Sequence, residues 1–356
     1  NAFDFNDDLD EEIEEDEGGW DMEDDDLDIP DEFEDIDDVE DATPLAAKPE
    51  DGVSGEIAFW LRNNKTAAGY VAAGSFEQAA TLLNKQLAVV NFAPLRKRFL
   101  EVYTSNKLYL PGVAELPAMK DYIREHNDED DPHKFRPLIP GYDSLEEKLA
   151  TAFKLFKTNN LPEAINVFRD IIYTIAVLTV DDDEQEAKCD DILILCREYI
   201  LGLSIELERR ALDPSDVKRN LELAAYFTRA KLQNAHRVNA LQVAMSQSFK
   251  NKNYTSASYF AGELLSIIST GAKAEQAQKI RARAESISSE AYEIDFDPYA
   301  EFDICCASFT PIYKGSDVVT EALVGAKYKA EYKGQVCRIT NVTSIGVPAS
   351  GLRIKV

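Results

Sequence analysis

The sequence predicts a mainly α-helical chain: an irregular α-solenoid of helical hairpins, with a small antiparallel β module at the C-terminus and an acidic extended arm at the N-terminus. Two apolar stripes at helical spacing flank a short turn within residues 143–180. One hairpin cannot bury both stripes alone, so it needs neighbours of the same kind. Short β-branched runs between glycines occupy residues 295–356 and indicate strands.

Residues 143–180 predict two antiparallel helices. Ser144 and Glu147 match a capping box, which marks a helix start. Asn159 and Asn160 supply turn chemistry, and Pro162 suits the first turn of the next helix. The first stripe consists of Leu145, Leu149, Phe153 and Phe156, and the second of Ile165, Phe168, Ile172 and Ile175.

A turn followed by a helix occurs three times, each time with a large apolar residue after the turn and an alanine three positions later. The pairs are Phe76 and Ala79, Leu161 and Ala164, and Tyr254 and Ala257. We expect the large residue to wedge between the helices and the alanine to let them approach closely. The copies lie 85 and 93 residues apart, so the repeat is not regular. An ordinary helical domain that reuses a common hairpin is the alternative.

The pattern divides the chain into four segments. Residues 1–52 form the acidic arm, and residues 53–142 hold a helical hairpin and a proline-rich stretch with a candidate β-hairpin over 100–110. Residues 143–294 form the solenoid-like body, and residues 295–356 form the β module. Further helices of the body are expected over roughly 216–232, 235–250, 254–269 and 272–292.

The net charge of −28 is concentrated in the arm. Residues 1–50 contain 25 acidic residues and one lysine, whereas the rest of the chain has a net charge of −4. No basic face is evident, so nucleic-acid binding is not expected. Apolar side chains are interleaved with the acids, among them Trp20 and Phe33. Such a pattern suits an extended segment that docks on a partner, or a solvated linker.

No motif for catalysis or cofactor binding is present. His126, His133 and His236 are isolated from other ligands at metal-binding spacing. Cys189 and Cys196 lie seven residues apart on one helix face, which predicts core positions and suits a reducing compartment. We therefore expect a non-enzymatic binding protein with no cofactor, no metal and no small-molecule substrate. No apolar run is long enough to span a membrane.

Several phrases resemble the C-terminal region of the coatomer alpha subunit. They include residues 73–77, 196–204, 224–228, 302–305, 311–313, 333–340 and 351–354. The resemblance implies a non-enzymatic structural subunit of the COPI vesicle coat, which acts in Golgi-to-ER and intra-Golgi transport. It also implies binding to the epsilon subunit, a tetratricopeptide-repeat protein, and to other coatomer subunits. The implied location is cytoplasmic and peripheral on Golgi and COPI vesicle membranes.

One departure from this family concerns a cysteine cluster. Many relatives carry cysteine at the positions of Glu321 and Lys327, which with Cys305 and Cys337 makes a four-cysteine set. Two of the four are replaced in this sequence. A metal role is therefore not supported here, and we expect the β module to be held by packing.

A solenoid partner often encloses an extended or hairpin element. The candidate partner-binding residues are therefore Tyr103, Leu108, Tyr109, Leu110 and Val113, with Trp20 and Phe33 in the arm. Their alternative role is packing on the chain's own helices. A second hypothesis makes the acidic arm a regulatory segment that binds a basic partner, with the helical body as its scaffold. Binding through the arm should weaken steeply with salt, unlike binding through an apolar surface.

Overall fold

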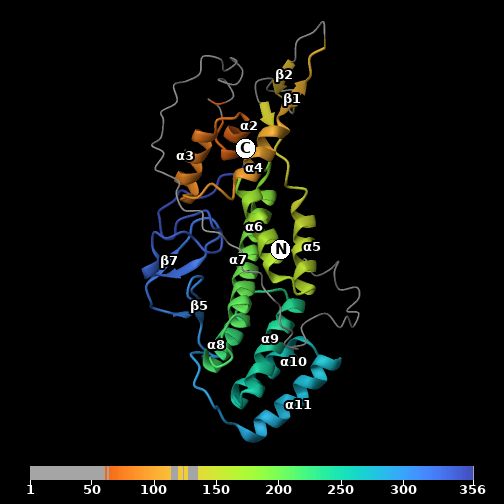
Figure 1. Cartoon of the computed structure of the whole chain (residues 1–356), viewed down its shortest axis with the longest axis vertical. Coiled ribbons are helices and arrows are strands. Elements are labelled where there is room, and N and C mark those ends of the chain that lie inside the picture. Colours follow the sequence, from red (N-terminus) through yellow and green to blue (C-terminus); the bar gives the residue numbers. More distant parts are fainter. Residues whose placement is uncertain (1–60, 62–63, 114–118, 123, 127–134, 356) are drawn as a thin grey trace.

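The computed structural model describes residues 61, 64–113, 119–122, 124–126 and 135–355, and the predicted acidic arm lies outside these residues. The described chain is mainly α-helical, as predicted, with small antiparallel sheets near the C-terminus. Figure 1 shows an elongated stack, with α2–α4 toward one end, α5–α7 in the middle and α8–α11 toward the other end. No helix in this part of the chain is long and apolar enough to cross a bilayer.

Ten α-helices lie in the described residues. They are α2 (Ala67–Ala72), α3 (Phe76–Leu87), α4 (Arg96–Ser105), α5 (Leu145–Lys157), α6 (Leu161–Ala176), α7 (Asp183–Arg210), α8 (Val217–Phe227), α9 (Asn234–Lys250), α10 (Tyr254–Ile267) and α11 (Ala272–Ile287). From α5 to α11 each helix packs on the next one along the chain. The body is therefore a run of helical hairpins, and it is irregular because the helices differ widely in length.

The three predicted turns share one backbone geometry. Gly74, Asn159 and Lys252 have φ of 82°, 59° and 64°, in the left-handed region that ends many helices. The next residue has φ of −86° or −87° in each copy. Its amide donates to the carbonyl five residues earlier, at 2.8–2.9 Å in all three copies. The copies are thus structural repeats, although their spacing along the chain is uneven.

Packing at these turns is only partly as predicted. Ala79, Ala164 and Ala257 are completely buried, so the small residue does allow close approach. Of the large residues, only Leu161 is buried. Phe76 is 39% exposed, because α3 lies near the end of the stack.

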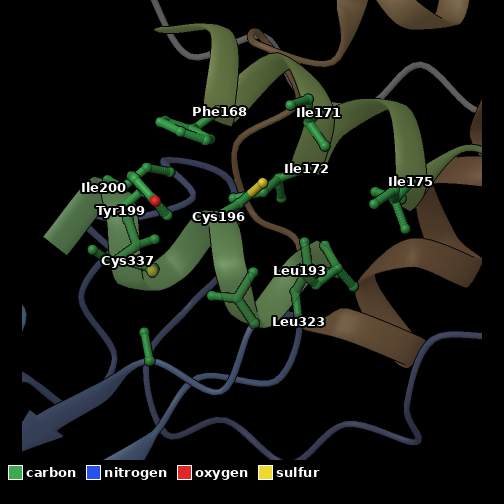
Figure 2. Close-up of a cluster of buried hydrophobic side chains, with 14 of the residues drawn as sticks. Phe168, Ile171, Ile172, Ile175, Leu193, Cys196, Tyr199, Ile200, Leu323 and Cys337 are labelled. Carbon is green, nitrogen blue, oxygen red and sulfur yellow. The ribbon is translucent and has the colours of Figure 1, made fainter. Parts of the chain in front are cut away.

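The core is continuous from the helices into the C-terminal segment. Phe168 on α6 is fully buried, and its ring lies 4.9 Å from that of Tyr199 on α7. Figure 2 shows this cluster together with Leu323 and Cys337 of the C-terminal segment. Cys189 and Cys196 are buried on α7, as their spacing predicts.

The β module packs on the helical body, a relationship that the sequence left open. In it β5 (Phe302–Ile304) pairs with β6 (Pro311–Tyr313), and β7 (Val318–Thr320) pairs with β8 (Lys327–Lys329). Arg169 on α6 donates from Nε to the Ile339 carbonyl and from Nη2 to the Arg338 carbonyl, both at 3.0 Å. Arg197 on α7 donates to the Val324 carbonyl at 2.8 Å. Arginines on two helices therefore satisfy backbone carbonyls of the module.

Two local predictions are wrong. The helix α5 does begin directly after Ser144, but the capping box does not form, because the Ser144 hydroxyl donates instead to the Gly141 carbonyl at 2.8 Å. Residues 100–105 belong to α4 and not to a hairpin strand, because Val102 is drawn into the core on the helix's inner face. A hairpin does form, but it begins at Lys107.

Candidate protein-protein interface

Three of the predicted binding residues, Leu108, Tyr109 and Leu110, lie on a β-ribbon that starts directly after α4. Strand β1 (Lys107–Leu110) pairs antiparallel with β2 (Met119–Tyr122), with Leu108 opposite Asp121 and Leu110 opposite Met119. Chain residues further on form β3 (Arg124–His126) and β4 (Phe135–Pro137), which pair with each other. Figure 1 shows β1 and β2 projecting beyond the helices at one end of the molecule.

Four of the predicted residues are solvent-exposed. Leu108, Tyr109 and Leu110 expose 42%, 59% and 47% of their surface, and Val113 exposes 66%. Successive strand residues point to opposite faces, so Tyr109 lies on one face of the ribbon and the two leucines lie on the other. Both faces of β1 therefore present apolar surface to solvent.

Tyr103 has a different place. It lies half-buried on α4, with its ring 5.3 Å from that of Phe76 on α3. The Nζ of Lys107 lies 4.3 Å above the Tyr103 ring, in a cation–π contact. Tyr103 therefore supports the base of the ribbon and does not lie on its exposed tip.

Asn106 joins the ribbon to the body. Its side chain is completely buried at the C-terminal end of α4. The Nδ2 group donates to the carbonyls of Val102 and Leu138 at 2.7 Å, and Oδ1 accepts from the Leu138 amide at 2.8 Å. Asn106 directly precedes β1 and Leu138 directly follows β4, so this one side chain ties both ends of the segment that carries the ribbon to the end of α4.

The sequence reasoning missed three exposed apolar residues beside the ribbon. Phe76, Leu100 and Leu138 expose 39%, 50% and 37% of their surface. Leu100 lies one helical turn before Tyr103, and Leu138 is the residue that Asn106 holds. The three-residue spacing of Leu100 and Tyr103 puts both side chains on one helix face, so the sequence could have indicated this apolar surface. Trp20 and Phe33, the two candidates in the arm, lie outside the described residues.

The positions of the four-cysteine set hold other contacts here. Glu321 is buried, and its carboxylate accepts from the amides of Leu323 and Val324 at 2.8 and 2.9 Å. Lys327 pairs with Asp303 at 2.6 Å. Within the described residues no group of three or more histidine, cysteine or acidic side chains could hold a metal ion.

A stack of helical hairpins that carries a C-terminal β module and a projecting apolar ribbon defines a class of protein: an interaction scaffold. Comparison with known proteins identifies the particular family. The family model for the C-terminus of the coatomer (COPI) alpha subunit matches residues 1–356. The chain belongs to this family, as the resemblance in the sequence indicated.

Coatomer alpha subunits from three organisms are similar to this chain. The coatomer subunit alpha of Saccharomyces cerevisiae is 49% identical over 98% of this chain and 28% of its own length. A putative coatomer subunit alpha of Schizosaccharomyces pombe is 40% identical over 84% of this chain and 25% of its own length. Coatomer subunit alpha of Dictyostelium discoideum is 32% identical over 88% of this chain and 26% of its own length. The chain thus spans about a quarter of the length of these relatives.

Proposed function

We propose that this chain is a non-enzymatic scaffold of the COPI coat that holds the epsilon subunit of coatomer through the β1–β2 ribbon. The observation that carries the proposal is the exposure of Leu108, Tyr109, Leu110 and Val113 on a projecting ribbon. Family membership supports association with other coatomer subunits. The protein would act in the cytoplasm and be peripheral to Golgi and COPI vesicle membranes, in Golgi-to-ER and intra-Golgi transport.

A ribbon that is open to solvent on both faces is costly in free energy. A two-stranded hairpin is marginally stable in water, and apolar side chains on both of its faces lose the free energy that burial would provide. A partner that surrounds the ribbon removes both deficits, because it covers Tyr109 on one face and the two leucines on the other. A helical-repeat partner has a concave surface of the right kind for this purpose.

A double substitution on opposite faces of the ribbon tests the proposal. Leu108→Asp combined with Tyr109→Ser should weaken binding to the purified epsilon subunit at least about tenfold, because aromatic anchors contribute about 2 kcal/mol or more to an interface. Helix content and melting temperature should be unchanged, since neither side chain belongs to the core. Isothermal titration calorimetry measures the affinity.

The β module offers a matched control. Val318 and Val336 expose 47% and 46% of their surface, so Val318→Asp with Val336→Ser removes exposed apolar surface from the β module by the same two changes of charge and polarity. The control should bind normally, and binding should change little between low and high salt. Equal affinity of the ribbon variant and the control would rule out this surface. Loss of binding at raised salt would instead favour the acidic arm.

A further inference from the structure

A hollow of about 350 Å³ lies where α4, α6 and the loop around Asn341 meet, and none of its lining residues belongs to the ribbon. Its charged lining consists of Lys97, Arg98, Arg169 and Asp170. Asp170 is already paired with Lys148, whose Nζ lies 2.6 Å from its carboxylate. The hollow therefore carries a surplus of positive charge, although the chain outside the acidic arm has a net charge of −4.

Arg98 is the buried part of this lining. It is 6% exposed, and its Nη2 donates to the carbonyls of Pro140 and Val177. Its Nη1 lies 3.5 Å from the half-exposed carboxylate of Glu101. Its Nε is buried and has no hydrogen-bond partner among the described residues. Its guanidinium is therefore a fixed positive charge in the wall of the hollow, held in place by backbone carbonyls.

The other two cations are also incompletely neutralised. Lys97 is 78% exposed, and its nearest carboxylate is that of Glu101 at 3.9 Å. Arg169 donates to backbone carbonyls, which carry no net charge, and no carboxylate in the described residues forms an ion pair with it. Arginine and lysine in this arrangement suit a carboxylate, which can accept from several donors at once.

The chain itself supplies such a ligand. Residues 1–50 contain 25 acidic side chains and one lysine. This segment leads into α2, and α2 packs against α4, which carries Lys97 and Arg98. Only residues 51–66 separate the acidic segment from α2. A short tether raises the local concentration of the acids to about the millimolar range.

We infer that the hollow lined by Lys97, Arg98 and Arg169 is a carboxylate-binding site, occupied by acidic side chains from residues 1–50 of the same chain. The site holds the acidic segment on the body by charge. The site does not include the apolar ribbon, so this inference can be tested separately from the binding of the epsilon subunit.

Carbodiimide cross-linking of the full chain tests the inference, because this reagent joins carboxylates only to amines in contact with them. Cross-links between residues 1–50 and Lys97 should exceed those to Lys279, an exposed lysine on α11, by about tenfold. The excess should disappear at about 0.5 M salt, where the Debye length is only a few ångströms. It should not depend on protein concentration, since the ligand is tethered.

Two variants place the contact inside the hollow. Asn166 is an exposed lining residue on α6, so Asn166→Asp adds a negative charge there without disturbing the core. It should reduce the Lys97 cross-links several-fold, whereas Gln276→Glu, the same charge change on α11, should leave them unchanged. Equal labelling of Lys97 and Lys279 would overturn the inference. So would cross-links that ignore Asn166→Asp, or cross-links that grow with concentration and therefore join two chains.

Discussion

The hydroxyl of Tyr199 on α7 lies 2.7 Å from Nδ1 of His236 on α9, and both side chains are buried. The rings of Phe153 and Phe156 on α5 lie 5.4 and 4.4 Å from the imidazole. Three helices thus meet around one neutral histidine. Burial, with a smaller effect of the positive charge of Lys157, lowers the pKa of His236 to about 4.

This burial predicts acid sensitivity. Between pH 6.5 and pH 4 the unfolded chain binds a proton at His236 and the folded chain does not, so stability is complete above pH 6.5 and falls as the pH drops toward 4. The loss attributable to this residue should reach about 3 kcal/mol. Urea unfolding of the wild type and of His236→Gln at pH 7 and pH 4.5 measures it. Because carboxylates also titrate in this range, the difference between the two proteins is the informative quantity, and identical pH dependence would contradict the prediction.

The buried carboxylate of Glu206 should be essential for stability. It is completely buried and accepts from Nε and Nη2 of Arg209 at 2.8 and 2.9 Å and from Nε of Arg210 at 2.8 Å. Glu206→Ala leaves Arg209 buried without its partner, and should lower the free energy of unfolding by about 3–5 kcal/mol. Glu285→Ala, which breaks an exposed pair with Arg281, should cost less than about 1 kcal/mol. Similar losses in the free energy of unfolding for the two variants would show that burial does not increase the contribution of the ion pair.

Removal of the Phe168 ring should destabilise the helical body. The side chain is completely buried and contacts the rings of Phe153 and Tyr199. Phe168→Ala should therefore cost about 3–5 kcal/mol, measured by chemical unfolding. Leu100→Ala, on the exposed side of α4, should change stability by less than about 0.5 kcal/mol. A melting temperature unchanged by Phe168→Ala would mean that the core is assigned wrongly.

The Asn106 amide should control the order of the ribbon. Asn106→Ala leaves the partly buried amide of Leu138 without its acceptor, at a cost of about 1 kcal/mol. Hydrogen exchange of residues 107–110 should accelerate more than that of α6, because the lost bonds hold only the base of the ribbon. Asn84→Ala, which removes a single bond to the Val89 carbonyl, serves as the control. Equal acceleration throughout the protein would point to general destabilisation and not to local release.

Some of the candidate site was visible in the sequence, and some was not. The run Leu108-Tyr109-Leu110 is β-rich and apolar, so a strand there follows from composition. Leu100 and Tyr103 carry similar residue types, but they lie on a helix, because tertiary contacts of Val102 outweigh local β propensity. The hollow at Arg98 left no sequence signal, since its residues come from three separate segments.

The sequence alone determined the local elements of this protein. Helical spacing of apolar residues located the helices of the body, and left-handed turns at Asn159 and Gly74 follow from residues that tolerate positive φ. The tertiary structure decided what those elements do together. Placement of the β module on α6 and α7 depends on Arg169 and Arg197 reaching carbonyls more than a hundred residues away. Periodicity records which face of an element is apolar, but not which distant surface will cover it, because that choice depends on the packing of the whole chain.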